Sequence, residues 1–164
     1  MKHFSNQCPN SVGIFNVEGY HQVYPFCLHE IKVEKTDIKI SGLNPNKKLN
    51  DFGKGPFCKF SIDEHLNEIG LYCFVVDDEL KYIGQTVCPF KKRINDGYGT
   101  IYPYNCYADG QRTNCHINSL VNEALLDGKE IRVGFYPMND EMDALESELI
   151  EANNLTRSGW NLKK

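Results

Sequence analysis

The chain has 164 residues, of which 41% are hydrophobic and 24% charged, so it is long enough for one ordinary globular domain or a compact core with an appended arm. No apolar run approaches the roughly 20 residues that a membrane-spanning helix requires, and residues 1–10 lack the apolar stretch of a secretory signal, so we expect a cytoplasmic protein. The net charge of −4 argues mildly against nucleic-acid binding.

Charge is unevenly distributed along the chain. Residues 31–60 carry seven lysines against three acidic residues, whereas residues 139–154 carry six acidic residues and no lysine or arginine. A chain with one cationic stretch can hold a polyanion locally whatever its net charge, although both stretches are also compatible with ordinary solvated surfaces.

The seven cysteines are scattered and odd in number, which in a reducing compartment favours free thiols over disulfides. Cys106, Cys115 and His116 could in principle join a zinc site. The closely spaced C-x-x-C pairs typical of structural zinc are absent, so the sequence does not favour such a site.

The first 30 residues are aromatic and irregular, with weak strand character in VGIFNV (12–17). Residues 30–41 alternate apolar and polar positions, as a half-buried hairpin does, and residues 42–56 are rich in Gly, Pro and Asn, which predicts an exposed loop. Ser61 and Glu64 have the spacing of a capping box, which predicts a short helix before Gly70.

The stretch GLYCFVVDDELKYIGQT (70–86) predicts two strands joined by an acidic turn. Pro89 then starts a helix through Asp96, and a long polar-aromatic loop follows over residues 98–112. We expect a helix over 113–128, a strand over 130–137 and an amphipathic helix over 139–154, capped by Asn139 or Asp140. This order indicates an α/β (α+β) fold with a small antiparallel or mixed sheet flanked by helices.

The turn length of the 70–86 hairpin decides where its two tyrosines lie. A two-residue turn at 77–78 would put Tyr72 and Tyr82 on opposite faces of the sheet. A three-residue turn at 77–79 pairs Phe74 with Tyr82 and places both tyrosines on one face, as diagonal neighbours. We expect the odd-length turn, with an aromatic pair that merely covers the sheet as the plain alternative.

An arginine and a glutamate complete a possible catalytic set. Arg93 borders the apolar stripe formed by Phe90 and Ile94, and Glu148 falls about 60° around its helix from Leu145, at the rim of the core. Two phenols, a guanidinium and a lone carboxylate suit phosphodiester hydrolysis. Arginine neutralises phosphate oxygens, a carboxylate holds a divalent cation, and a phenol orients or deprotonates water.

In chain order, Gly70-Leu71-Tyr72, Tyr82-Ile83-Gly84, Arg93, Glu148 and Asn161 resemble the signature of the GIY-YIG nuclease superfamily over residues 69–164. The resemblance implies a nuclease core of a three-stranded antiparallel sheet flanked by helices, preceded by a β-rich or irregular DNA-contacting extension over residues 1–68. Two departures stand out: Leu71 replaces the usual isoleucine, and Arg93 comes one residue later than in many members.

The resemblance also implies a role for each residue. Tyr72 would be the general base or water-positioning phenol, Tyr82 would hydrogen-bond near the scissile phosphate, and Arg93 would bind that phosphate. Glu148 would hold one Mg²⁺ or Mn²⁺ ion per active site, and Asn161 would support the site or touch phosphate. Three lysines offer further phosphate contacts, and the last two of them could also replace the arginine: Lys81, Lys91 and Lys92.

The arrangement looks most like the small type II restriction endonucleases of the superfamily, which implies sequence-specific cleavage of double-stranded DNA by a homodimer on a palindromic site. Two alternatives stay open: a structure-specific or weakly specific nuclease of repair or phage biology, and a catalytically silent DNA-binding or interaction module. The candidate DNA contacts are three phosphate-binding lysines, Lys47, Lys48 and Lys54, and four base-reading side chains, Asn105, Gln111, Arg112 and Asn114.

Overall fold

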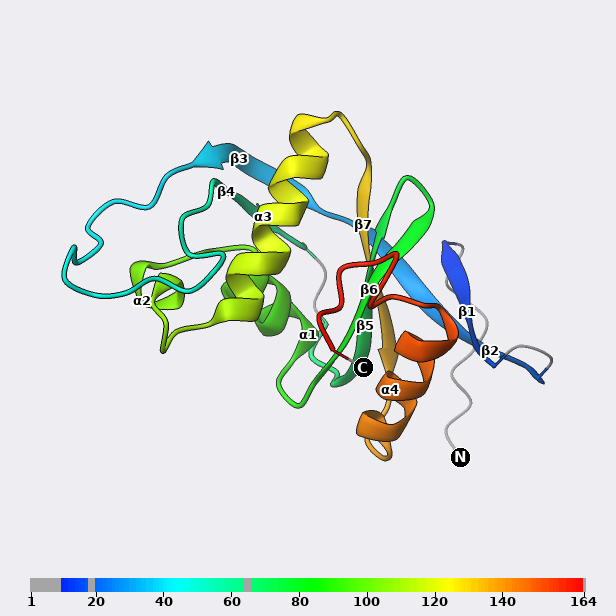
Figure 1. Cartoon of the computed structure of the whole chain (residues 1–164). Coiled ribbons are helices and arrows are strands. Elements are labelled where there is room, and N and C mark those ends of the chain that lie inside the picture. Colours follow the sequence, from blue (N-terminus) through cyan, green and yellow to red (C-terminus); the bar gives the residue numbers. More distant parts are fainter. Residues whose placement is uncertain (1–9, 18–19, 64–65, 164) are drawn as a thin grey trace.

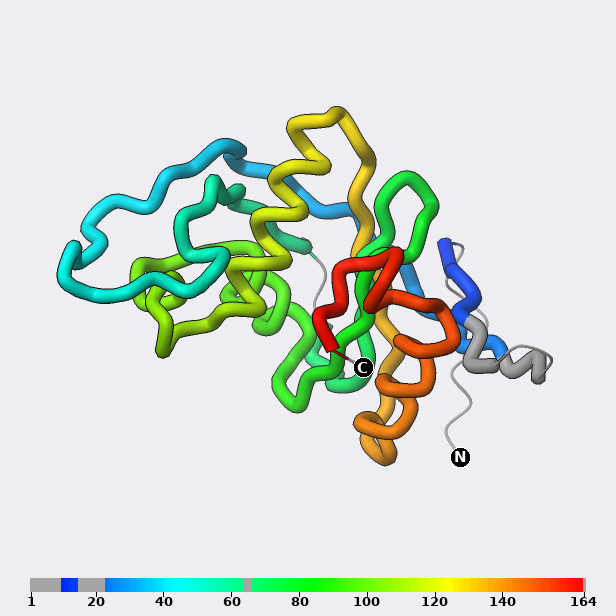
Figure 2. Tube along the Cα trace, in the orientation of Figure 1, coloured from blue at the N-terminus to red at the C-terminus, as the bar shows by residue number. Residues whose placement is uncertain are grey.

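The computed structural model describes residues 10–17, 20–63 and 66–163 (Figures 1 and 2). Its strands are β1 (Ser11–Val17), β2 (Tyr20–Glu30), β3 (Lys32–Ile38), β4 (Phe57–Ser61), β5 (Gly70–Val76), β6 (Glu79–Thr86) and β7 (Ile131–Pro137). Its helices are α1 (Phe90–Lys92), the π-helix η1 (Arg93–Tyr98), α2 (Pro103–Cys106), α3 (Arg112–Leu126) and α4 (Met142–Ala152).

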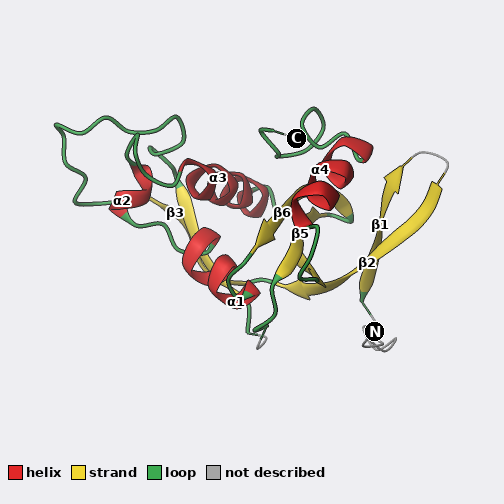
Figure 3. Ribbon diagram, turned by 90° about the horizontal axis from the view of Figure 1, so that it is seen from below, coloured by secondary structure: helices red, strands yellow, loops and turns green. Residues whose placement is uncertain are grey.

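A curled antiparallel sheet in the order β1-β2-β7-β5-β6 runs through the molecule, and β3 pairs with β4 in a second sheet. The expectation of an α+β fold with an antiparallel sheet is confirmed, although the main sheet has five strands where three were expected. Figure 3 shows β1 and β2 at one end of the molecule and β3, α2 and the adjoining loops at the other.

Strands that precede residue 68 contribute to the main sheet and to the core of the rest of the chain. β2 pairs with β7, and Cys58 and Phe60 of β4 pack in the same buried cluster as Tyr72 of β5. Residues 1–68, as far as they are described, therefore do not pack as a separate unit.

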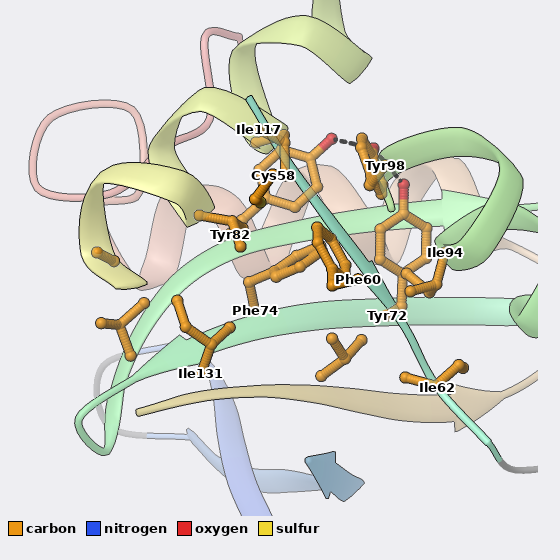
Figure 4. Packing of buried hydrophobic residues seen from close by; sticks show 14 of the residues in the cluster. Cys58, Phe60, Ile62, Tyr72, Phe74, Tyr82, Ile94, Tyr98, Ile117 and Ile131 are labelled. Atoms are coloured by element: carbon orange, nitrogen blue, oxygen red, sulfur yellow. Dashed lines mark hydrogen bonds between the residues drawn. The ribbon is translucent and has the colours of Figure 1, made fainter. Parts of the chain in front are cut away.

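Both faces of β5 are covered, which is why all seven of its residues are buried. Tyr72 and Phe74 face the cluster that β4, η1 and α3 complete (Figure 4). Leu71 and Cys73 face the opposite way and pack in the cluster that contains Leu149 of α4. Because side chains alternate along a strand, consecutive residues of β5 serve two different layers.

The 70–86 hairpin has the expected Phe74–Tyr82 pair, but its turn is shorter than expected. Its turn has two residues, Asp77 and Asp78, whose φ angles of 47° and 67° suit the tight turns that hairpins favour. The prediction of a three-residue turn is therefore wrong. A bulge in β6 adds one residue before Tyr82, so Phe74 still pairs with Tyr82, and Tyr72 and Tyr82 lie on one face as predicted.

Other sequence predictions need correction. Ser61 ends β4, and residues 62–63 and 66–69 form no helix, while Glu64 lies outside the described residues. Residues 30–41 do not form a hairpin of their own, because β3 pairs with the distant strand β4. Helix α4 begins after Glu141, and not with Asn139 or Asp140 as its cap.

Five cysteines are free thiols: Cys58, Cys73, Cys88, Cys106 and Cys115. Cys27 is disulfide-bonded, so the expectation of free thiols is wrong at that position. Cys8 lies outside the described residues. Over the ranges that the structure describes, no helix has the length and apolar character needed to cross a bilayer.

Candidate functional site

Three tyrosines meet on the covered face of the hairpin: Tyr72 from β5, Tyr82 from β6 and Tyr98 from the end of η1. The Tyr98 hydroxyl lies 2.7 Å from the Tyr72 hydroxyl and 3.2 Å from that of Tyr82 (Figure 4). All three side chains are buried, at 1%, 8% and 0% exposure for Tyr72, Tyr82 and Tyr98. One hydroxyl therefore joins the other two into a single buried network.

Arg93 enters this network as a cation. Its Nε donates to the Tyr72 hydroxyl at 3.2 Å and its Nη2 to the Tyr98 hydroxyl at 2.7 Å. Its Nη1 donates to Asn114 Oδ1 at 3.3 Å, and the guanidinium lies 4.4 Å from the centre of the Tyr98 ring. These acceptors are neutral, so the three hydrogen bonds do not cancel the positive charge of Arg93.

The π-helical turn explains how Tyr98 reaches Arg93. The Gly99 amide donates to the Ile94 carbonyl at 2.6 Å, a spacing of five residues, and such a turn brings residues five apart onto one side of the helix. The sequence predicted that the helix ends at Asp96, so Tyr98 was assigned to a loop and missed. A π turn leaves no pattern of apolar residues by which it could have been found.

Burial raises the pKa of all three phenols well above their ordinary value, and the nearby Arg93 charge only partly opposes this effect. Tyr72, Tyr82 and Tyr98 are therefore protonated near neutral pH, and Tyr82, the least buried of the three, can donate a hydrogen bond to an anion. The arrangement suits a phenol that orients or donates better than the general base expected of Tyr72.

The glycines of the two tripeptides make room for this cluster. A Cβ on Gly84 would lie 2.5 Å from the Tyr72 hydroxyl, so only glycine lets the Tyr72 ring cross β6. Gly70 has a φ of 144°, and a Cβ there would strike the backbone carbonyl of Tyr136 on β7.

A cavity of about 380 Å³ opens beside the tyrosine cluster and is lined by residues of α3, α4 and the C-terminal segment. Tyr82 is the member of the tyrosine network that lines it. The other lining residues that matter here are Glu146 and Ile150 from α4, Arg112 and His116 from α3, and Trp160 and Asn161 from the C-terminal segment.

Glu146 is the carboxylate that the fold brings to this cavity. Gln85 of β6 donates to Glu146 Oε2 at 2.9 Å and also to the neighbouring Asp143. Burial raises the pKa of Glu146, whereas the bond from Gln85 and the positive charge of Arg93 act in the opposite direction. The carboxylate is therefore within electrostatic range of the guanidinium.

Glu148, the glutamate expected to hold a metal ion, is not brought to the site. It is exposed, and its charge acts on Tyr24 of β2. The helix that carries it packs on the opposite face of the sheet from Tyr72. The sequence contained a reason to prefer Glu146. Ile150 lies one turn after Glu146 on the same side of the helix, and this apolar residue is buried, so the buried side of α4 extends toward Glu146.

Asn161 and Lys81 take part in the contacts between the C-terminal segment and the edge strand β6. The Asn161 amide donates to the Ile83 carbonyl at 2.8 Å and accepts from the Ile83 amide at 3.1 Å, so the side chain is bonded to the β6 backbone at the margin of the cavity. The Trp160 amide donates to the Lys81 carbonyl at 2.6 Å, so the C-terminal segment covers β6. The Lys81 amine pairs with Glu79 at 2.6 Å.

Two expected base-reading residues are internal supports instead. Asn105 is 2% exposed and its Oδ1 accepts from the Tyr102 amide at 2.7 Å, while Asn114 is 5% exposed and bonds Arg93. Neither side chain is free to contact a base. The remaining candidates stay accessible on the surface or at its rim: Lys47, Lys48, Lys54, Lys91, Lys92, Gln111 and Arg112.

Lys91 and Lys92 lie beside Asn95 and Asp96 in a separate shallow depression, not against the tyrosines. Arg93 itself makes the hydrogen bonds to Tyr72 and Tyr98. The later position of this arginine in the sequence is therefore compatible with the role expected of it.

The side chains near the cavity suit Mg²⁺ better than zinc. Mg²⁺ is commonly held by one or two carboxylates together with water and substrate phosphate, and Glu146, with Asp143 beside it, fits that pattern. Among the described residues, no group of three or more His, Cys, Asp or Glu side chains could hold a metal ion, and His116 packs against the Phe52 ring instead of joining Cys106 and Cys115.

Comparisons of this chain with models of known protein families, with curated proteins and with solved structures give no match.

Proposed function

We propose that this protein is a divalent-metal-dependent endonuclease that hydrolyses phosphodiester bonds of double-stranded DNA at a specific sequence. One observation carries the proposal: Arg93 is a largely buried cation bonded to neutral oxygens, and its partner Tyr98 links it to Tyr82, which lines a cavity together with the carboxylate of Glu146. Such a site attracts an anion, and the resemblance of the sequence to the GIY-YIG nucleases supports a phosphodiester.

The proposed roles follow from position. Arg93 offsets the negative charge that develops on the phosphoryl oxygens, and Tyr82, which lines the cavity, donates a hydrogen bond to the phosphate or positions the attacking water. Tyr72 and Tyr98 hold Arg93 in place. Glu146 holds the Mg²⁺ or Mn²⁺ ion, which supplies Lewis-acid stabilisation when it is bound.

The basic segment, residues 31–60, supplies contacts to the DNA backbone. Its loop projects from the molecule (Figure 1), and Lys47, Lys48 and Lys54 are exposed along it. Lysines in such a position neutralise phosphates without reading sequence. Because one site cuts one strand, we propose that two copies act together on a palindrome.

Plasmid DNA tests the proposal. Incubated with the protein and Mg²⁺, it should give discrete fragments, and EDTA should abolish the reaction. Sequencing the fragment ends then gives the recognition sequence and the position of each cut. A smear would instead indicate a weakly specific nuclease.

A catalytically silent DNA-binding module is the second candidate. The burial of Tyr72, at 1% exposure, together with its raised pKa favours it, since a protonated Tyr72 cannot act as the base. Retarded but intact plasmid in the same assay would support this candidate. Plasmid that is neither bound nor cut would overturn both.

A further inference from the structure

We infer that Arg112 forms a second phosphate subsite, which binds the backbone phosphate next to the one that is cleaved. The inference rests on the proposed function, because it concerns how the same cavity holds the DNA strand. Arg112 lies in the first turn of α3 and lines the cavity together with Tyr82 and Glu146. A strand whose scissile phosphate lies at Tyr82 and Glu146 would bring its next phosphate toward the Arg112 wall.

The guanidinium of Arg112 is already oriented. It lies 4.9 Å from the centre of the Phe52 ring, and that ring lies 4.3 Å from the ring of His116. The His116 Nε2 donates to the Trp160 carbonyl at 3.0 Å, which fixes the imidazole that packs against Phe52. A planar guanidinium held over an aromatic ring loses little freedom when it binds an anion, and its paired donors match phosphate oxygens.

The present partner of Arg112 is easily exchanged. Asp51 accepts from Arg112 Nε at 3.2 Å and from Nη2 at 3.0 Å, yet the two side chains are 47% and 76% exposed for Arg112 and Asp51. Exposed ion pairs contribute little to stability, because water screens them. Asp51 therefore competes with a phosphate for the same donors instead of locking Arg112 into the fold.

The charges around the cavity favour this placement. Burial lowers the pKa of His116, and the Arg112 charge lowers it further, so the imidazole is neutral near neutral pH. The positive charge of this wall comes from Arg112 and Lys163, whereas Glu146 on the α4 side supplies the negative charge that a metal ion requires. The α4 wall can thus hold one phosphate through a metal ion on Glu146, and the α3 wall can hold the next phosphate through the guanidinium of Arg112.

Two substitutions that break the same ion pair test the inference. Arg112→Gln removes the phosphate ligand, and Asp51→Asn removes its competitor. Arg132→Gln is the matched control, since Arg132 also pairs with exposed carboxylates, those of Asp78 and Glu130, at the far end of the hairpin. Binding of a labelled duplex that carries the cleavage site is measured by fluorescence anisotropy in EDTA over a range of salt concentrations.

Arg112→Gln should weaken binding about five- to tenfold at about 0.1 M salt and reduce the salt slope by about one, as expected for one lost phosphate contact. Asp51→Asn should tighten binding, and Arg132→Gln should match the wild type. If the ion pair is only structural, Arg112→Gln and Asp51→Asn shift binding in the same direction, and the inference is overturned. It is also overturned if Arg112→Gln behaves like Arg132→Gln. A wild-type protein that binds no duplex would instead reject the proposed function.

Discussion

The two faces of β5 differ in chemistry although they belong to the same seven residues. Leu71 and Cys73 meet an apolar layer that includes Leu149 of α4, whereas Tyr72 meets Tyr98 and Arg93 in a buried polar network. Burying a charge costs free energy that burying a leucine does not. The contacts that Leu71 and Cys73 make with Leu149 should therefore contribute stability alone, whereas the network of Tyr72, Tyr98 and Arg93 should contribute to the chemistry.

Arg93→Gln gives the largest expected effect on activity. Loss of one donor to the developing phosphoryl charge lowers cleavage by about 100- to 1,000-fold in comparable sites. The free energy of unfolding should change little, because the substitution also removes a buried charge. Single-turnover cleavage and urea denaturation measure the two quantities.

The control for this substitution is Arg157→Gln, because Arg157 is an exposed arginine that follows α4. It should cleave like the wild type. An Arg93→Gln protein that is unfolded, or one that cleaves normally, would contradict the assignment of chemistry to the tyrosine face.

Leu149→Ala, on the α4 side of β5, should lower stability and leave cleavage unchanged. Leu149 is 0% exposed, and truncating such a leucine typically lowers the free energy of unfolding by about 2–5 kcal/mol. Cleavage per folded molecule should be unchanged. Leu126→Ala is the control, since Leu126 is 57% exposed and its truncation should cost no more than about 0.5 kcal/mol. Equal effects of the two substitutions would show that α4 does not stabilise the sheet as described.

Glu146→Gln should change stability in a pH-dependent way, with a smaller effect. The pKa of Glu146 is raised in the folded state, so the folded protein keeps this proton where the unfolded chain has lost it. Stability then falls as the pH rises through that window. Removing the charge should make Glu146→Gln more stable than the wild type at about pH 8, and equal to it at about pH 3, below the ordinary glutamate range.

Chemical denaturation at several pH values measures this difference. Glu148→Gln, an exposed position two residues away on the same helix, is the control substitution and is measured at the same pH values. A Glu146→Gln protein that is less stable than the wild type at about pH 8 would indicate that the carboxylate supports the fold.

The strands of the 70–86 hairpin, β7 and the long helices were predictable because their signals are local, whereas β2 and β4 were not predicted. The alternation in residues 70–86 and the helical spacing in 113–128 correspond to β5, β6 and α3. The turn was predicted with the wrong length, because a two-residue turn with a bulge and a three-residue turn give the same Phe74–Tyr82 pair. Sequence periodicity alone does not separate these two possibilities.

The candidate site was only partly predictable, because it depends on contacts between distant segments. Tyr72, Tyr82 and Arg93 do come together as expected. Tyr98 joins them through a π turn, and Glu146 takes the place expected of Glu148. The choice between two glutamates in one acidic helix depends on which side of α4 meets the edge of β6, and that is a property of the tertiary structure.

The most direct measurement compares Glu146→Gln with Glu148→Gln in single-turnover cleavage of a duplex that carries the recognition site, at saturating protein and Mg²⁺. We expect Glu146→Gln to lose about three orders of magnitude in rate while it still binds the duplex, as loss of a metal ligand predicts. Glu148→Gln should cleave within about twofold of the wild type. Normal cleavage by Glu146→Gln, or loss of cleavage in Glu148→Gln alone, would contradict the account.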